Sequence, residues 1–404
     1  MRRDLLAALA SGRSRPPPLV LDFRTSSAFG FAVDTVVPAG CAYTRAASPG
    51  TVQTGTSGLY DLSIFSAVAN LLVWGRASDA WEVGLVLEEA RTNLLARGRD
   101  YSHASWAVTA ATRTPGQSDP FGGSGASRIQ VSSGVSALGE SVLSACAGAS
   151  TVSAWLRATS VPTAPNMNMD RSPSARIATN AVADTTWSRI AHSATGTGGE
   201  TTAMLVVDGR NWSGIGGVVA AARDIVVDAC QREVGGFPSE WIPTTAGAAT
   251  RNATFLRALS ATVTPKLATG RLSIELKFRA KGARTEYGGT TSLWYVDANN
   301  QAAFVASTGV LTITVAGATN TCTLPSWARY DLVEISVQCG GSLATVVKYR
   351  LNSGAVTSLA ITGSALGTHA TGDVYLFSTN AGQHLSCWAY VAAFYAPGAP
   401  SWAS

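Results

Sequence analysis

The chain carries little charge for its length. Lysine, arginine, aspartate and glutamate make up 14% of the 404 residues, whereas about 25% is usual in soluble domains. The 30 basic residues are scattered outside the N-terminal segment MRRDLLAALASGRSR, and no basic stripe with interleaved aromatics occurs. We therefore expect no specific nucleic-acid binding. The net charge of +5 leaves two interpretations open, a preference for anionic partners such as acidic polysaccharide or simply an ordinary surface.

Cysteine is also scarce, and its spacing argues against metal binding. The six cysteines form no CxxC pair and no cluster with histidine, so we expect no zinc site. We interpret most of them as buried free thiols, which suits a reducing cytosol. The apolar stretch Leu5–Ala10 is short and follows Asp4, so no secretory signal is predicted. No apolar run reaches the length of a membrane-spanning helix, and we expect no membrane insertion.

Catalytic motifs are missing as well. The four histidines form no HxH or HExxH pair, GxSxG does not occur, and "GIGGVV" lacks the last glycine of a phosphate-binding loop. Asp170, Asp208 and Asp228 could join a paired-carboxylate glycosidase site, but the sequence does not place them face to face. We expect no enzymatic activity and no cofactor. Calcium stays open, because the acidic residues are too dispersed to choose its oxygen ligands.

The sequence is rich in segments that alternate apolar and polar residues, and in glycine. From Trp106 onward, segments such as "STVSAWLRATS" and "ARDIVVDACQRE" alternate apolar and polar residues, as half-buried strands do. On them Trp155, Trp187 and Ile190 are predicted to point inward. After the break at residues 235–255, a second set begins with "RLSIELKFRA" and includes "LVEISVQCG". This rhythm predicts an all-β protein, with a first antiparallel β sandwich or jelly roll and a second β sandwich, and with helix limited to residues 4–12 and 86–97.

The N-terminal segment is predicted to attach the chain to another surface. Residues 4–12 can form one short amphipathic helix, which the prolines at 16–18 separate from the rest. A helix this short is marginal by itself, so it is either a docking peptide or a frayed tail. Residues 34–80 are turn-rich and are expected to pack loosely, in part against neighbouring subunits. The expected attachment residues are Arg2, Arg3, Leu5, Leu6 and Leu9.

Two motifs carry a resemblance to a known family. "GLVLEEARTNLLARGRDYSHASW" resembles the "GLLIEEARTNLL…S.DF..A.W" segment of tailed-bacteriophage structural proteins, where it leads into a carbohydrate-binding-module-like jelly roll. "CQREVGGFPSEWIPTTAGAATR" resembles the segment that closes this jelly roll, "QLE.G.FPTSYIPTT…..TR", except that Arg232 replaces leucine and Trp241 replaces tyrosine. Residues 84–251 are covered by this pair. Residues 19–60 resemble the upstream part of the same family, and the C-terminal portion resembles a laminin-G or concanavalin-A-like sandwich.

The resemblance implies a division of the chain and a role for its first motif. Glu88, Glu89 and Arg91 are expected to be structural, with Glu88 and Arg91 paired at i, i+3 on a helix; an acid/base pair is the alternative. The leucines of the motif, Leu85, Leu87, Leu94 and Leu95, are expected to be buried. The expected parts are an attachment peptide (1–18), a β-rich or irregular connecting region (19–95), the jelly roll (96–250) and the concanavalin-A/laminin-G-like sandwich (251–404).

The resemblance also implies a function. The family consists of virion proteins, so we expect a fibre, spike or appendage, on the tail rather than on the head. The protein is expected to assemble in the host cytoplasm as a homotrimer. Its partners are expected to be other virion proteins and a bacterial surface polysaccharide. Two alternatives stay open: a depolymerase of capsular polysaccharide, and a structural decoration or adaptor protein without affinity for sugar.

A glycan site on a β sandwich is expected to combine an aromatic face with polar side chains on loops. The leading candidates lie in the Gly-rich segment "DGRNWSGIGG": Trp212, Asp208, Arg210 and Asn211. A second group lies between residues 287 and 299: Tyr287, Trp294, Tyr295, Asp297 and Asn299. For each aromatic residue the alternative is a ring packed in the core or against a neighbouring subunit.

Overall fold

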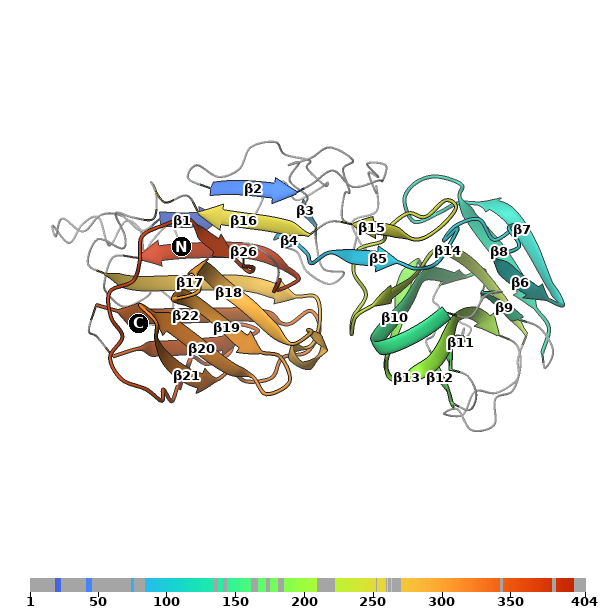
Figure 1. Ribbon diagram of the computed structural model, residues 1–404. Coiled ribbons are helices and arrows are strands. Elements are labelled where there is room, and N and C mark those ends of the chain that lie inside the picture. Colours follow the sequence, from blue (N-terminus) through green and yellow to red (C-terminus); the bar gives the residue numbers. More distant parts are fainter. Residues whose placement is uncertain are drawn as a thin grey trace.

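The computed structural model describes most of the chain from residue 19 to residue 395. The described residues are 19–22, 41–45, 74–75, 84–133, 137–140, 144–160, 166–171, 175–180, 185–208, 222–251, 253–258, 260, 263, 270–341, 344–379 and 383–395. They form two bodies side by side (Figure 1), built almost entirely from antiparallel strands with one 3-10 helix, η1 (Arg284–Glu286). The predicted all-β class is therefore confirmed. The predicted helix at 4–12 lies outside the described residues.

The first body, the jelly roll, is an 11-stranded sheet that curls around its own core. Its main path runs in the order β12 (Ala175–Asn180), β11 (Asn166–Arg171), β13 (Ser188–Asp208), β10 (Ser144–Ala158), β14 (Arg223–Val234), β5 (Arg91–Asn93) and β15 (Ala249–Arg251). Shorter strands attach beside it: β6 (Trp106–Thr109), β7 (Ala111–Gln117), β8 (Ala126–Val131) and β9 (Ala137–Glu140). Alternate residues such as Val152, Ala154 and Leu156 fill the core, as the period of two predicts.

The two faces of β10 and β13 correct one prediction about the tryptophans. Ile190 lies in the main core, as expected. Trp155 is buried on the opposite face, because it is one residue out of phase with Ala154 and Leu156, and Trp187 packs against the same cluster as Trp155. Residues 187 and 190 differ by an odd number, so a regular strand cannot turn both to one face. The jelly roll therefore has a second packed layer outside its main core.

The second body, the sandwich, consists of two sheets. One has the order β24 (Thr357–Leu359), β23 (Val346–Leu351), β22 (Leu332–Gly340), β17 (Arg271–Ala280), β26 (Cys387–Tyr395), β4 (Gly84–Leu87) and β3 (Trp74–Gly75), with β1 (Leu19–Asp22) paired to β26. The other has the order β2 (Cys41–Arg45), β16 (Thr254–Ala258), β25 (Val374–Leu376), β18 (Thr290–Asp297), β19 (Asn300–Val305), β20 (Val310–Val315) and β21 (Ala318–Thr323). Strands β17 and β22 coincide with the predicted segments "RLSIELKFRA" and "LVEISVQCG".

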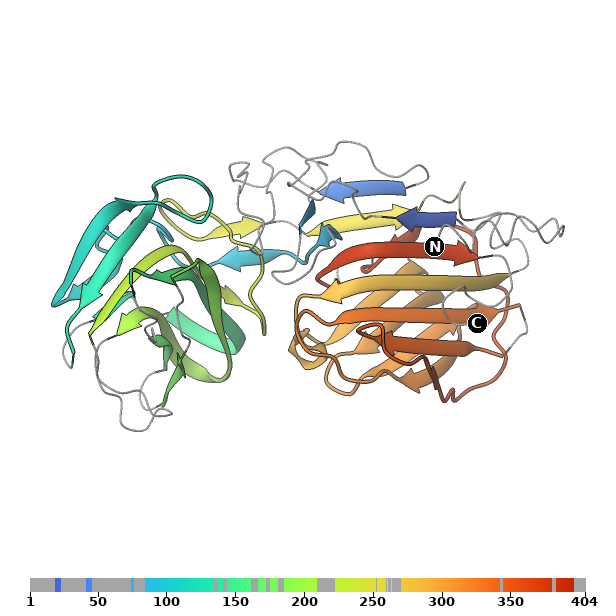
Figure 2. The same ribbon diagram turned by 180° about the vertical axis from the view of Figure 1, so that it is seen from behind.

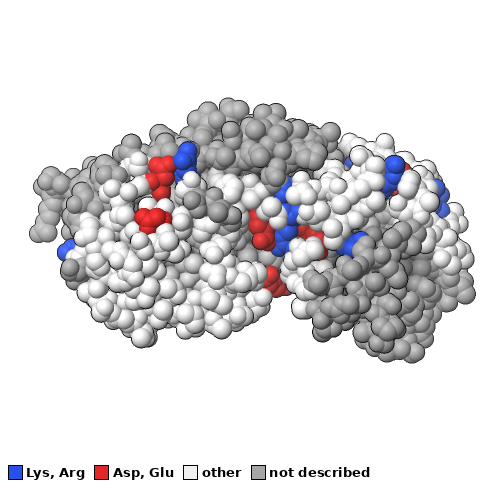
Figure 3. All heavy atoms as spheres, viewed as in Figure 1, with Lys and Arg blue, Asp and Glu red and all other residues white. Residues whose placement is uncertain are grey.

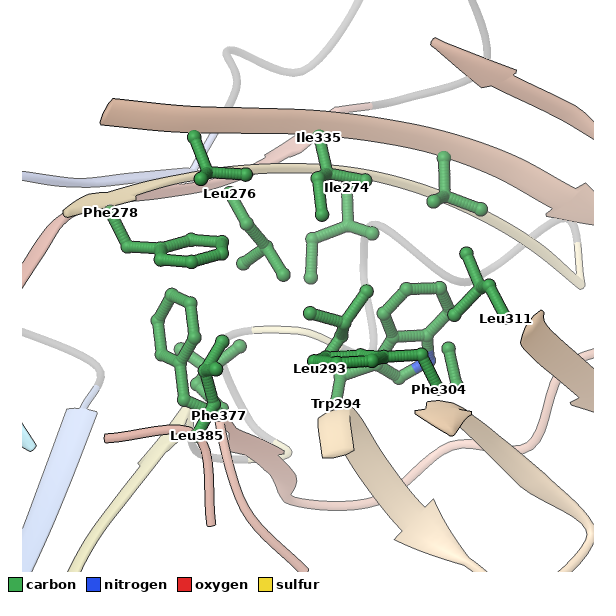
Figure 4. Packing of buried hydrophobic residues seen from close by; sticks show 14 of the residues in the cluster. Ile274, Leu276, Phe278, Leu293, Trp294, Phe304, Leu311, Ile335, Phe377 and Leu385 are labelled. Carbon is green, nitrogen blue, oxygen red and sulfur yellow. The ribbon is translucent and has the colours of Figure 1, made fainter. Parts of the chain in front are cut away.

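The sandwich core lies between these sheets. Figure 4 shows Ile274, Leu276 and Phe278 facing Leu293, Trp294 and Phe304 across the interface. Figure 2 shows the sheet of β17, β22, β23 and β26 from behind. The four cysteines with described side chains, Cys230, Cys322, Cys339 and Cys387, are buried free thiols, as predicted. Burial raises the pKa of Cys322 to about 11 and that of Cys339 to about 12, which keeps both thiols protonated and inert at neutral pH.

Strands from the N-terminal region complete the sandwich, so the expected linear division of the chain is corrected. Residues 19–95 do not form a separate connecting region, because β1 and β4 pair with β26, and β2 pairs with β16. The sheet edges of the sandwich would otherwise be unpaired at these positions. The jelly roll, from β5 to β15, is thus inserted into a sandwich that the chain begins before it and resumes after it (Figure 1).

The chain crosses between the two bodies at residues 88–90, between β4 and β5, and again after Arg251, between β15 and β16. The predicted helix at 86–97 is wrong, because β4 ends at Leu87 and Arg91–Asn93 pair with β15 as strand β5. Asn93 fixes this local structure, since its buried amide donates to the Ile242 carbonyl (2.8 Å) and accepts from two backbone N–H groups. Leu87 and Leu95 are buried, as expected, but Leu94 is only partly buried, and the side chain of Leu85 lies outside the described part.

Four buried charges join the two crossings, and we call them the junction network: Glu88, Glu240, Arg251 and Lys281. Glu88 is 1% exposed and accepts from Arg251 and from Lys281, each at 2.7 Å, and Lys281 also pairs with Glu240. Burial by itself would raise the pKa of Glu88, but the two cations lower it below its usual value. The predicted pair of Glu88 with Arg91 does not form. Arg91 pairs with Glu89 instead and donates to the Val234 carbonyl.

Charged side chains are sparse on the described part of the face seen in Figure 3, except at the junction. Figure 3 shows acidic and basic atoms gathered where the two bodies meet, and few on the broad face of the sandwich. Arg329 adds a second link there, because it pairs with Glu286 (2.7 Å) and donates to the Gly236 carbonyl and to Ser193 of β13, both at 2.9 Å. Gly236 lies so near η1 that an added Cβ would be 2.6 Å from the Glu286 carbonyl oxygen. The junction is therefore closely packed on both sides.

Candidate functional site

The leading sequence-predicted glycan site cannot be placed. Arg210, Asn211 and Trp212 lie outside the described residues, and so do the attachment residues Arg2, Arg3, Leu5, Leu6 and Leu9. Asp208 is the last residue of β13, but its side chain is outside the described part. The proposal that Trp212 binds sugar therefore stays a prediction.

Two residues of the second predicted group belong to the sandwich core. Trp294 is fully buried, and Tyr287 is 5% exposed. The Tyr287 hydroxyl donates to the Ser386 carbonyl at 2.7 Å and accepts from the Gly282 N–H at 3.1 Å. Burial raises the pKa of this hydroxyl well above its usual value. Neither ring presents a face to solvent, so their assignment to a loop-based glycan site is corrected to core packing.

The other three residues of that group stay at the surface. Tyr295 is half-buried on the outer face of β18, and its ring meets that of Tyr375 edge-on with centroids 6.4 Å apart. Asp297 accepts from the backbone N–H of Asn299 (2.8 Å) and from the Asn300 side chain (2.9 Å), so it shapes the turn between β18 and β19. Asp297 is occupied with this turn, and only the tyrosine pair offers a ring to a ligand here.

A stronger candidate lies on the outer layer of the jelly roll, and sequence reasoning missed it. Four aromatic residues pack together there, and we call them the aromatic surface: Phe121, Trp155, Trp187 and Trp241. The rings of Phe121 and Trp241 are stacked with centroids 5.3 Å apart, and Phe121 meets Trp155 edge-on at 6.2 Å. Trp155 and Trp241 are buried and form the floor. Phe121 and Trp187 are only partly buried, so they are the rings that a ligand can reach.

Arg99 holds the floor of the aromatic surface together. Its guanidinium lies 5.4 Å from the ring centroids of both Phe121 and Trp241, and it makes two bonds to Asp228, at 2.7 and 2.6 Å. It also pairs with Asp119. Burial raises the pKa of Asp228 to about 6 even though Arg99 lowers it. Arg99 is therefore a structural cation whose charge is neutralised by buried carboxylates.

Asp119 organises the loop that presents Phe121. Its carboxylate accepts from the backbone N–H groups of Phe121 (2.9 Å), Gly123 (2.8 Å) and Gly125 (3.0 Å). Burial by itself would raise its pKa, but these N–H groups and Arg99 lower it below the usual value. The sequence signal was the segment "SDPFGGSG", an Asx-type turn with an aromatic residue at its tip. The sequence did not show which face of the sheet the loop would cover.

Two further arginines border Trp187. Arg189 lies directly opposite Trp155 in the pairing of β13 with β10, so both side chains are on the outer face. Its guanidinium donates to Ser153 at 2.9 Å. The Arg157 guanidinium lies 5.3 Å from the Trp187 ring centroid and donates to Ser118 at 3.2 Å. The reachable edge of the aromatic surface therefore combines a partly buried indole, which has the Arg157 guanidinium over its ring, with two cationic donors.

The described residues give little support to hydrolytic chemistry at this surface. Asp119 and Asp228 are the nearest carboxylates to the floor, but both bind the same guanidinium, so they do not face each other across an open space. Within the described part of the chain, no group of three His, Cys, Asp or Glu residues is placed to hold a metal ion. No helix of the described residues is long and apolar enough to cross a membrane.

Comparisons with known proteins give a likeness in structure but none in sequence. No family model matches the sequence, and no curated protein is significantly similar to it. Among solved structures, the chain is similar to the mouse laminin alpha1 chain, domains LG4-5, with 9% sequence identity and a TM-score of 0.20. The likeness covers 76% of this chain and 89% of that one. Because the TM-score is low, our description of the fold rests on the strand pairing alone.

Proposed function

We propose that this chain is a non-enzymatic glycan-binding protein and that its aromatic surface is the binding site. The observation that carries the proposal is the partly buried Trp187 ring on the outer face of the jelly roll, with Arg157 over it and Arg189 nearby on the same face. A pyranose has an apolar face that stacks on an indole and hydroxyl groups that need donors and acceptors. The aromatic surface offers both in one place, on a rigid sheet.

The kind of particle to which the chain belongs is proposed from the sequence resemblance. We propose a fibre, spike or appendage of a tailed-phage-like particle, with the chain in a homotrimer and the jelly roll turned toward a bacterial surface polysaccharide. The motifs that carry the resemblance supply four charged residues of the crossings, Glu88, Glu89, Arg91 and Arg251. Their role in fixing the jelly roll to the sandwich fits a domain that projects from a particle.

The two alternative functions are separable from this one. A capsule depolymerase would shorten its polymer, which a loss of viscosity would reveal, whereas a binding protein leaves chain length unchanged. A decoration or adaptor protein would bind no polysaccharide. The partly exposed Phe121 and Trp187 favour the binding function over the adaptor, because their accessible parts add apolar ring surface beside cationic donors at one place on the jelly roll.

Replacing Trp187 by alanine is expected to weaken glycan binding by about tenfold to a hundredfold, since a stacked ring at a binding site is worth a few kcal/mol. The melting temperature should change little, because the ring is only partly buried. The measurement is adsorption of the purified protein to a panel of bacterial cells and their purified surface polysaccharides.

Tyr295→Ala is the matched variant, because it removes a half-buried ring from the sandwich instead. Binding that survives Trp187→Ala and is lost in Tyr295→Ala moves the site to the sandwich. A wild-type chain that binds none of the polysaccharides contradicts the proposed function itself.

A further inference from the structure

The cations of the aromatic surface fall into two groups. Arg99 is neutralised, because it binds the carboxylates of both Asp228 and Asp119. Arg157 and Arg189 are different. Among the described residues their hydrogen bonds go to the hydroxyl groups of Ser118 and Ser153, and neither forms a salt bridge. Within the described part of the chain, two positive charges therefore border the partly buried indole without a carboxylate to balance them.

The strand register brings these two charges to one place. Trp155 is paired with Arg189, and Leu156 with Ser188. Continuing this register by one residue places Arg157 opposite Trp187 and diagonally across from Arg189. Side chains on such a diagonal have Cβ atoms roughly 7–8 Å apart. Asp228 lies on the far side of β10 from Arg189, two strand spacings or about 10 Å away.

We infer that the glycan bound at the aromatic surface is acidic, and that Arg157 and Arg189 bind its anionic group while the ring of that saccharide unit, or of the next one, stacks on Trp187. This rests on the proposed function. A neutral sugar would use the hydroxyl donors and acceptors of any polar side chain, and it would leave both positive charges unbalanced. An anion accepts charge-assisted hydrogen bonds from the planar guanidinium fork, which fits a carboxylate or a phosphate ester equally well.

The ligand class follows from this chemistry. A uronic or sialic acid carries a carboxylate directly on the pyranose ring, and a sugar phosphate carries its charge one atom further out. In both cases the anion lies within a few ångströms of the apolar ring face, as the spacing of Trp187, Arg157 and Arg189 requires. Electrostatic attraction to these arginines should also make association depend on ionic strength, because the site is at the surface.

The test uses the full chain and capsular polysaccharides in matched forms. Each uronic-acid or sialic-acid polymer is used in its native form and after carboxyl reduction, and each polymer with phosphate monoester side groups before and after phosphatase treatment. Dextran is the neutral control. We expect binding to the native acidic polymers, a loss of at least tenfold on carboxyl reduction or on phosphate removal, and weaker binding as salt rises. The arm that loses binding identifies the anion as carboxylate or phosphate.

Arg189→Gln is expected to weaken binding of the acidic polymer by about tenfold to a hundredfold, as for the loss of a hydrogen bond between charged groups. Arg189→Lys should keep the salt dependence but recover only part of the affinity. Arg271→Gln, in the sandwich, makes the same change in net charge and should have no effect. Equal binding of native and neutralised polymers, or an unaffected Arg189→Gln, overturns the inference while the proposed function stands. Failure of every polymer to bind overturns both.

Discussion

Replacing Glu88 by glutamine is expected to lower the free energy of unfolding by about 3–5 kcal/mol, as measured for other buried pairs that lose one partner. Glutamine has nearly the same shape, so the change isolates the charge. Lys281 would then keep Glu240 as its carboxylate partner, whereas Arg251 would lose its ion pair with Glu88 and keep its bond to the Glu240 backbone carbonyl. Because Glu88 is only 1% exposed, water cannot replace the lost charge. Urea unfolding at pH 7 measures the loss.

Two comparisons show whether the loss comes from buried charge. Asp373→Asn affects the pair with Arg257, whose side chains are 37% and 29% exposed, and should cost less than about 1 kcal/mol. The double variant Glu88→Gln, Lys281→Met removes one charge of each sign. It should be more stable than the sum of the single losses predicts, with a coupling of about 0.5–3 kcal/mol. Strict additivity would show that the four charges do not act together.

Replacing Arg99 by methionine is the second change with a large expected effect. Methionine keeps the apolar stem that lies against Phe121 and Trp241, but it leaves Asp228 fully buried without its counter-charge. We expect a loss of about 3–5 kcal/mol at neutral pH. Arg128→Met is the matched control. Its partner, Asp224, is about one-third exposed, so the expected loss is below about 1 kcal/mol.

The loss caused by Arg99→Met should depend on pH in a defined direction. The pKa of Asp228 is already raised from 3.8 to about 6, and removing Arg99, which lowers it, must raise it further. The folded state therefore keeps a proton that the unfolded state releases. The protonated Asp228 carboxyl makes its full contribution to the free energy of unfolding below about pH 4. That contribution is lost as the pH rises through the pKa of Asp228 in the folded state. The deficit should be small at pH 4–5 and largest at pH 7–8; a deficit independent of pH would contradict this account.

The strands were predictable from the sequence where one face of a sheet is buried. "RLSIELKFRA" and "LVEISVQCG" alternate, and both became strands with the predicted bounds. The segment 86–97 failed because its leucines and charges also fit a helical period. Its conformation is decided by partners far along the chain, such as Arg251 and Ile242, that a local pattern does not contain. The contribution of β1, β2 and β4 to the sandwich could not be predicted for the same reason, because they pair with strands far along the chain.

The candidate site was harder to predict than the fold. Sequence reasoning looked for aromatic residues on loops and chose Tyr287 and Trp294, which the sandwich buries. Trp187 was predicted to point inward from the alternation of apolar and polar residues in its segment. Its exposure depends on the phase of β13 relative to β10 and on how far Phe121 and Trp241 cover the outer face. These are properties of packing between segments that lie from 30 to more than 60 residues apart.

The insertion of the jelly roll into the sandwich has a consequence for synthesis on the ribosome. The jelly roll strands are all made by Arg251, so this body can fold while the rest of the chain is still being translated. Strands β1 and β4 must wait for β26, which is the last strand described. At about 5–20 residues per second, the wait of β1 is on the order of tens of seconds. During that time the backbone N–H and C=O groups of β1 can pair with other nascent chains. Copies that are being translated from the same messenger RNA would be the nearest of these.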